Sequence, residues 1–147
     1  PTFGTYDGAN IEIVQQSGEE NNYIFGLRVE DIERINHSYD PKGLYLQNPS
    51  RKRVVDTLIN GTIDDGGTGY FEDLYNALIG ERDQYYVLAD FDAFKQAEEK
   101  VFEDYKDKKK WAQKCLVNLA NAGTFSSDRT IRQYADEIWD IKPVSVE

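Results

Sequence analysis

Methionine is absent from the 147 residues, and the chain starts at Pro1 with a short strand-like stretch. Because translation begins with methionine, we expect an internal or C-terminal piece of a longer protein. Cysteine occurs once, as Cys115, which excludes an intramolecular disulfide framework and a zinc ribbon and suits a reducing compartment. Histidine also occurs once, as His37 in a turn, so a histidine-based triad or metal site has no recognisable partners.

Basic residues and long apolar runs are scarce. Lys and Arg number 17 against 27 Asp and Glu, which makes the net charge −10 at pH 7. A surface of this sign repels phosphate backbones and anionic lipid, so we expect no nucleic-acid partner and no membrane partner. No apolar run approaches the roughly 18 to 20 residues that span a bilayer, and no signal peptide is recognisable.

The residues that are present suffice for a core, since 39% are hydrophobic and 13% aromatic. Residues 2–5 and 23–26 are short, apolar and strand-like, and each precedes a stretch with helical spacing, at 9–17 and 29–35. The order strand, helix, strand, helix predicts a parallel pair of strands with open edges.

From residue 40 onward the pattern is mainly helical. Pro41 and Pro49 each follow a capping residue type at a predicted helix start, and residues 64–69 read as a loop. Residues 85–89 favour a further strand, with Asp90 as the cap of the helix after it. We therefore predict a helix-rich α/β fold for residues 1–147, with a β/α portion over 1–36 and a mainly helical portion over 37–147.

The most specific stretch connects the first strand to the first helix. It contains Gly4, Thr5, Asp7, Gly8 and Asn10. Ligands of open α/β sheets bind at the carboxyl ends of the strands, which makes this turn a candidate ligand-proximal site. The three-residue spacing between the glycines is not that of a dinucleotide-binding loop, and tight-turn packing explains the glycines equally well.

Three other features have simpler explanations than chemistry. Cys115 lies on the apolar stripe of a predicted helix, as a small buried hydrophobe does. Residues 64–67 lack the spacing and the distal Glu of a calcium loop. We interpret the basic cluster at 106–114 as a solvated helix start and not as an anion site. We likewise interpret Ser126 as a helix cap and not as part of an anion site.

Several blocks together resemble the α-glucan phosphorylases, which are the glycogen, starch and maltodextrin phosphorylases. Residues 4–12 read GTYDGANIE, residues 18–21 read GEEN, and residues 23–26 read YIFG. Near the end, residues 123–131 read GTFSSDRTI and are followed by Tyr134 and an Ile-Trp pair. These blocks occur in the family's order and extend over nearly the whole chain.

The resemblance implies an enzyme with two Rossmann-like lobes of the GT-B type. In that family, phosphate attacks the terminal α-1,4-linked glucose of a glucan and releases glucose 1-phosphate, with pyridoxal phosphate held on a lysine as cofactor. The family's lysine lies about ten residues before the glycine that matches Gly4, and the first lysine present here is Lys42. The resemblance therefore implies that this chain binds no pyridoxal phosphate by itself.

The implied place of the chain is the last part of the C-terminal lobe of a cytoplasmic enzyme. Its partners would be the rest of the phosphorylase chain and, through that, glucan and phosphate. The isolated piece is then expected to be inactive and to form homo-oligomers through bare apolar faces. The resemblance assigns no catalytic residue to this stretch. Two alternatives are an independent small helical protein-interaction module and a free nucleotide-binding domain.

Overall fold

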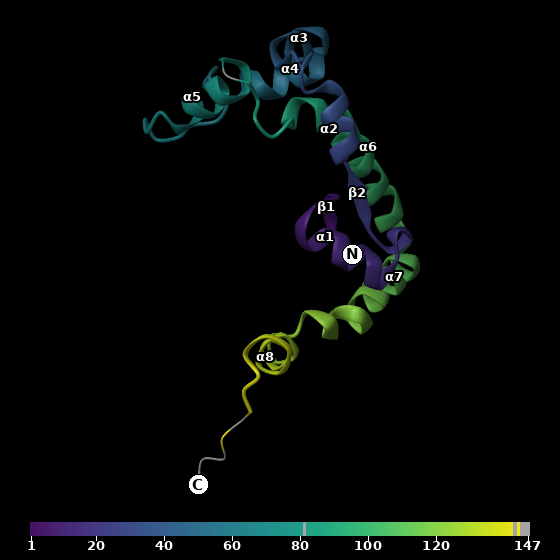
Figure 1. The fold of residues 1–147 in the computed structure, drawn as a ribbon. Coiled ribbons are helices and arrows are strands. Elements are labelled where there is room, and N and C mark those ends of the chain that lie inside the picture. Colours follow the sequence, from purple (N-terminus) through teal and green to yellow (C-terminus); the bar gives the residue numbers. More distant parts are fainter. Residues whose placement is uncertain (81, 143, 145–147) are drawn as a thin grey trace.

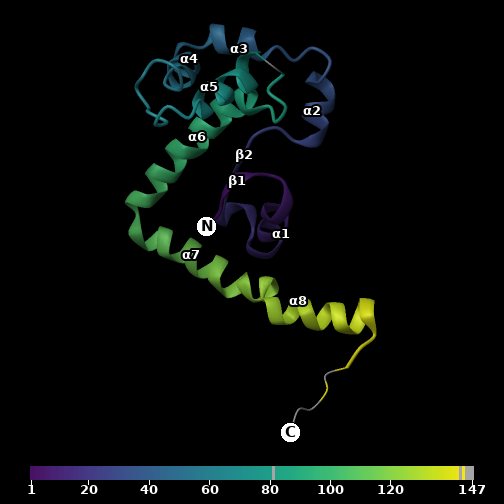
Figure 2. The same ribbon diagram turned by 90° about the vertical axis from the view of Figure 1, so that its left-hand side faces the viewer.

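The computed structural model describes residues 1–80, 82–142 and 144. Its elements form a curved arrangement, with α3, α4 and α5 at one end, α8 at the other, and the two strands on the concave side between them (Figure 1). The long helix α6 (Val87–Lys106) and the helix α7 (Lys108–Asn121) form the back of the curve. In the view turned by 90°, β1, β2 and α1 lie inside the angle between these two helices (Figure 2).

The predicted parallel pairing is confirmed. Strands β1 (Phe3–Thr5) and β2 (Tyr23–Phe25) are parallel, with Gly4 opposite Ile24. The helix α1 (Gly8–Ser17) and the short 3₁₀ helix η1 (Glu19–Asn21) make the crossover between them. The described residues form a sheet of these two strands alone, so both of its edges are open.

Aromatic contacts hold the small sheet against the long helices. The rings of Phe3 and Phe25 lie 5.0 Å apart between centroids, and each is 5.4 Å from the ring of Phe94 on α6. Tyr23 stacks on Trp111 of α7 at 6.0 Å. These rings cover part of the apolar face that two short strands cannot cover by themselves, although Phe3 and Phe94 stay partly exposed.

The other region is helical and contains its own small core. Its elements are α2 (Val29–Ile35), α3 (Pro41–Gln47), α4 (Pro49–Asp56), α5 (Tyr70–Tyr75) and the π-helical turn η2 (Asn76–Gly80). Asp40 and Asn48 accept backbone hydrogen bonds at the starts of α3 and α4, which confirms the starts predicted at the two prolines. Tyr45, Val55 and Leu88 form the buried cluster.

The strand predicted over 85–89 is wrong. Tyr85 lies in a turn, and α6 already begins at Val87. The carboxylate of Asp83 accepts hydrogen bonds from the amides of Val87 and Leu88 and so caps this helix, so the prediction that Asp90 is the cap is also wrong. The apolar run over 85–89 contains two aromatic residues and one β-branched residue and so resembles a strand locally, but the buried carboxylate of Asp83 stabilises a helix start here.

The C-terminal elements extend from α7 as an arm. They are the 3₁₀ helix η3 (Ala122–Phe125), α8 (Ser127–Gln133) and the π-helical η4 (Tyr134–Trp139). Ser126 occupies the N-cap position of α8, but its side chain makes no capping hydrogen bond. In the part of the chain that the structure describes, no helix combines the length and the apolar character needed to cross a membrane.

Candidate functional site

The turn between β1 and α1 is held by one asparagine. The Nδ2 of Asn10 donates to the carbonyl oxygen of Thr5 at 2.9 Å, and the hydroxyl of Thr2 donates to the Oδ1 of Asn10 at 2.9 Å. Asn10 therefore connects the first turn of the helix to both ends of the strand. A side-chain amide can supply both a donor and an acceptor in this way, whereas a carboxylate can only accept.

Three neighbours complete the turn. A Cβ atom added to Gly4 would lie 2.6 Å from the Nδ2 of Asn10, so the close approach of strand and asparagine requires glycine. The hydroxyl of Thr5 donates to the carboxylate of Asp7 at 3.1 Å. Gly8 begins the helix with φ at +46°, a left-handed conformation that favours glycine. Structural demands thus account for Gly4, Gly8 and Asn10.

A cavity of about 620 Å³ lies at the carboxyl ends of the two strands. We call it the strand-end cavity. Its lining comes from the ends of β1 and β2, from α2 and α4, and from the start of α6: Thr5, Tyr6, Asp7, Phe25, Leu27, Val29, Ile32, Val54, Tyr85, Val87, Asp90, Phe91 and Phe94. The volume falls within the range of small-molecule sites, about 300 to 1,000 Å³.

Two of the five predicted site residues, Thr5 and Asp7, line this cavity. Gly4, Gly8 and Asn10 lie in the same turn and shape it without lining the cavity. Asp90 cannot be recognised as a cavity residue from the sequence, because an Asp at the start of an apolar helical stretch is typical of a helix cap. The signal that identifies it is tertiary, since its partner Leu27 is 63 positions away.

Asp90 is a half-buried polar group of the cavity wall. Its Oδ1 accepts a hydrogen bond from the amide of Leu27 at 2.7 Å. Gly26 has φ at +88°, and a Cβ atom on it would meet the Oδ2 of Asp90 at 2.6 Å. Burial raises the pKa of Asp90 and the charge of Asp83 adds to this, while the Leu27 hydrogen bond opposes it.

A cation–π contact connects the two strand ends. The guanidinium of Arg28 lies 3.9 Å from the centroid of the Tyr6 ring. Arg28 follows the loop that Asp90 holds, and Tyr6 belongs to the turn that Asn10 holds. The cavity walls therefore support one another; they are formed by α6, the loop after β2 and the turn after β1.

The chemistry available in the cavity is limited. Its walls are mostly aromatic and aliphatic, and its ionisable side chains are Asp7, Asp90, Tyr6 and Tyr85. The lining residues named above include no lysine, arginine or histidine, so no side chain among them pairs with a phosphate group or forms a Schiff base. Within residues 1–80, 82–142 and 144, no group of three or more His, Cys, Asp or Glu could hold a metal ion.

Comparison with known proteins shows which family this chain resembles. The family model of the carbohydrate phosphorylases matches residues 1–141. The chain is 45% identical to the glycogen phosphorylase of Synechocystis over 147 residues, which is 99% of this chain and 17% of that protein. It is 41% identical to the Bacillus subtilis glycogen phosphorylase, with 97% and 18% covered. Against the muscle form from Mus musculus it is 40% identical, with 97% and 17% covered.

Proposed function

Because the chain belongs to the carbohydrate phosphorylase family, we propose that it contributes one wall of the active site of an α-glucan phosphorylase. In such an enzyme, phosphate cleaves the terminal α-1,4-linked glucose of a glucan and releases glucose 1-phosphate. The observation that carries the proposal is the family match over residues 1–141. The chain spans 17–18% of the length of the relatives described above, so the activity of a whole phosphorylase is part of this proposal.

Within the enzyme, we assign the chain to the last part of the C-terminal, Rossmann-like lobe. The parallel strands support this assignment, because a parallel pair joined by a helix is the repeating unit of such a lobe. The strand-end cavity supports it as well, since ligands of these lobes bind outside the carboxyl ends of the strands. In this proposal the Gly4–Asn10 turn faces the active site, and the enzyme is located in the cytoplasm.

We propose that this chain alone does not hold the family's cofactor. Pyridoxal phosphate needs a lysine for its Schiff base and donors for its phosphate, and the residues that line the strand-end cavity offer neither. We therefore derive no catalytic step from the residues described here. Their proposed role is to shape one wall of the active site and to exclude water from it. In this proposal, the lysine and the phosphate-binding groups belong to other parts of the enzyme.

A chimera tests the proposal directly. The matching segment of the Synechocystis glycogen phosphorylase is replaced by this chain, and release of glucose 1-phosphate from maltoheptaose and phosphate is measured. We expect phosphorolysis to be retained. An intact, folded chimera without activity would contradict the assignment of this chain to a glucan phosphorylase.

Two glycine variants of the chimera test the role of the turn separately. Gly4→Ala places a Cβ against Asn10, whereas a Cβ at Gly123 would meet nothing within 4 Å, so Gly123→Ala is the matched control. We expect Gly4→Ala to lower kcat/KM at least about tenfold, since small misplacements of an active-site wall are costly. Equal activity of the two variants would remove the turn from the active site while leaving the family function intact.

The isolated chain offers a second test. We expect no stoichiometric, single-site adduct when it is treated with pyridoxal phosphate and borohydride, and no phosphorolysis. A defined adduct on one lysine would contradict our account of where the cofactor lysine lies.

The comparisons give no support to an independent interaction module, because the match is to a catalytic family along almost the whole chain.

A further inference from the structure

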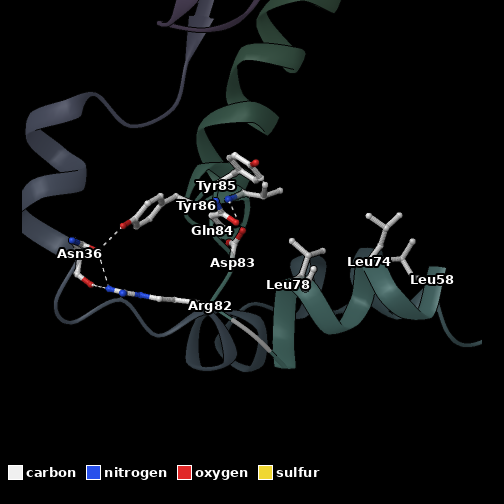
Figure 3. A pocket seen from close by; sticks show the side chains of 11 residues that line it. Asn36, Leu58, Leu74, Leu78, Arg82, Asp83, Gln84, Tyr85 and Tyr86 are labelled. Atoms are coloured by element: carbon white, nitrogen blue, oxygen red, sulfur yellow. Dashed lines mark hydrogen bonds between the residues drawn. The ribbon is translucent and has the colours of Figure 1, made fainter. Parts of the chain in front are cut away.

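The loop after α4 carries an Asn-Gly pair outside the packed core. Figure 3 shows the side chain of Leu58 beside that of Leu74, where both line a cavity of about 740 Å³. Two positions further along the chain, Asn60 and Gly61 are both exposed, so water reaches them freely. An asparagine followed by glycine occurs at this one place in the sequence.

The local backbone leaves the pair open to reaction. Asparagine is among the thermolabile residues, because its side-chain carbon can be attacked by the amide nitrogen of the next residue in the same chain. A side chain on that next residue would crowd the attack, and glycine has none. Gly61 has φ at +79°, and a Cβ atom on it would meet nothing within 4 Å. No neighbouring group therefore packs against the attacking residue.

The hydrogen bonds around the pair leave the attacking nitrogen free and hold the group that it attacks. Among the described residues, the amide of Gly61 donates to no backbone carbonyl. The amide of Thr62 donates to the Oδ1 of Asn60 at 3.0 Å. Negative charge develops on this Oδ1 during the attack, and a donor already directed at it stabilises that charge.

We propose that Asn60 is a site of spontaneous modification, at which the chain converts asparagine into aspartate and isoaspartate. The amide nitrogen of Gly61 loses its proton to a hydroxide ion from the solvent and attacks the Cγ of Asn60. The Cγ–Nδ2 bond then breaks, and the leaving nitrogen takes a proton from water and departs as ammonia. Both residues are now joined in a succinimide ring, and the hydroxide ion is restored.

Water opens this ring in one of two ways, and neither involves oxidation or reduction. Breaking the new bond between the Gly61 nitrogen and Cγ gives an ordinary aspartate. Breaking the original peptide bond instead gives isoaspartate, in which the main chain runs through the Cβ of the modified residue. This reaction does not depend on the proposed enzymatic function.

The product adds a negative charge beside an acidic cavity. Gly61 lines a cavity of about 580 Å³ together with Asp64, Asp65 and Glu72. Conversion of the preceding Asn60 brings a further carboxylate to this loop. The isoaspartate form also lengthens the main chain by one atom immediately before Gly61, and so changes the wall of this cavity.

The test incubates the full chain in a mildly alkaline buffer made with H₂¹⁸O and follows residues 54–82 by tandem mass spectrometry. These residues form a single tryptic peptide, since no Lys or Arg lies between Arg53 and Arg82. We expect Asn60 to be converted into aspartate and isoaspartate that carry the ¹⁸O label. We expect the rate in the folded chain to stay within about tenfold of that in a synthetic peptide of residues 57–64, because the fold does not shield the pair.

The same tryptic peptide contains an internal control. Asn76 is exposed as Asn60 is, but its ψ of −40° is helical and Ala77 follows it. A helical backbone holds the next amide nitrogen away from the side-chain carbon, and the alanine methyl group crowds the attack. We therefore expect Asn76 to remain unmodified while Asn60 is converted.

Three variants locate the reaction. Gly61→Ala should slow the conversion at least about tenfold, because a methyl group then stands beside the attacking nitrogen. Asn60→Gln should abolish it, since the ring would need a sixth member. Thr62→Ala keeps the backbone amide that donates to Asn60, so it is the matched control and should leave the rate unchanged. Because alanine is strained at φ of +79°, Gly61→Ala also shifts the loop, and Asn60→Gln decides in that case.

Each contrary result would overturn the proposal. An unmodified Asn60, or equal rates at Asn60 and Asn76, would show that this loop is no special site. Conversion more than about tenfold slower in the folded chain than in the peptide would show that the fold protects Asn60. Label uptake at position 60 that persists in Asn60→Gln would exclude ring closure through the Gly61 nitrogen.

Discussion

The helices around Leu88 and the helical arm at the C-terminal end contain similar apolar residues but bury them very differently. Leu88 is 2% exposed and Val55 is 5% exposed, in a cluster built from α3, α4 and α6. On the arm, Ile138 is 67% exposed and Ile131 is 55% exposed. The arm projects from the end of α7, away from the strands and from α3–α5 (Figures 1 and 2).

The difference shows that a helical pattern of apolar residues does not say where their partner lies. Around Leu88 the partner is in the same chain, and the buried area stabilises the helices. Short helices such as α8 depend on packing, since they are marginal by themselves in water. We therefore expect the exposed face of the arm to promote self-association of this chain.

The largest effect should come from the core. Leu88→Ala removes the most buried apolar side chain of the cluster and should lower the free energy of unfolding by about 2–5 kcal/mol. Leu119→Ala, at a residue 72% exposed on α7, should change it by less than about 0.5 kcal/mol. Urea titrations followed by circular dichroism measure both, and similar losses in the two variants would contradict the contrast between core and exposed face.

The cap of α6 should rank next. Asp83→Ala removes the acceptor of two helix amides and of the Tyr39 hydroxyl, and should cost about 1–3 kcal/mol. Burial and the contact with Asp83 together raise the pKa of Tyr39, so the variant should also move this pKa down toward its ordinary value. Tyrosinate absorbance in an alkaline titration reports it, and an unchanged titration would argue against the Asp83 contact.

A smaller effect should come from the cavity wall and depend on pH. Burial raises the pKa of Asp90 in the folded state, so its contribution to stability is complete below the ordinary carboxyl pKa and is lost as pH rises through the raised value. The unfolding free energy should therefore fall relative to Asp90→Asn as pH rises from about 3 to 6, by less than about 1 kcal/mol for this half-buried group. Parallel stability curves for the two proteins would disprove the raised pKa.

The smallest change in stability is expected on the arm. The double variant Ile131→Gln, Ile138→Gln should alter the free energy of unfolding by less than about 0.5 kcal/mol, because both side chains are more than half exposed. The same variant should weaken the self-association of the isolated chain, which sedimentation equilibrium measures. A monomeric wild-type chain would show that the exposed faces do not drive association.

Much of the candidate site could be predicted from the sequence, and one part could not. The Gly4–Asn10 turn follows from a glycine-bracketed Asp between a strand and a helix, and Thr5 and Asp7 of this turn line the strand-end cavity. Asp90 could not be recognised, because its partner Leu27 is remote in sequence. The cap that Asp83 provides is local, since the amides of Val87 and Leu88 lie four and five residues further on. Only its contact with the Tyr39 hydroxyl, 44 positions away, is remote in sequence.

The sequence by itself determined the family, the strand–helix–strand order, most helices and the parallel pairing, because local periodicity, turn residues and family motifs are properties of neighbouring residues. Only the tertiary structure decided that a turn and the start of α6 replace the strand predicted at 85–89, and that Asp90 supports the cavity wall. These features arise where burial and hydrogen bonds between remote segments outweigh local propensity.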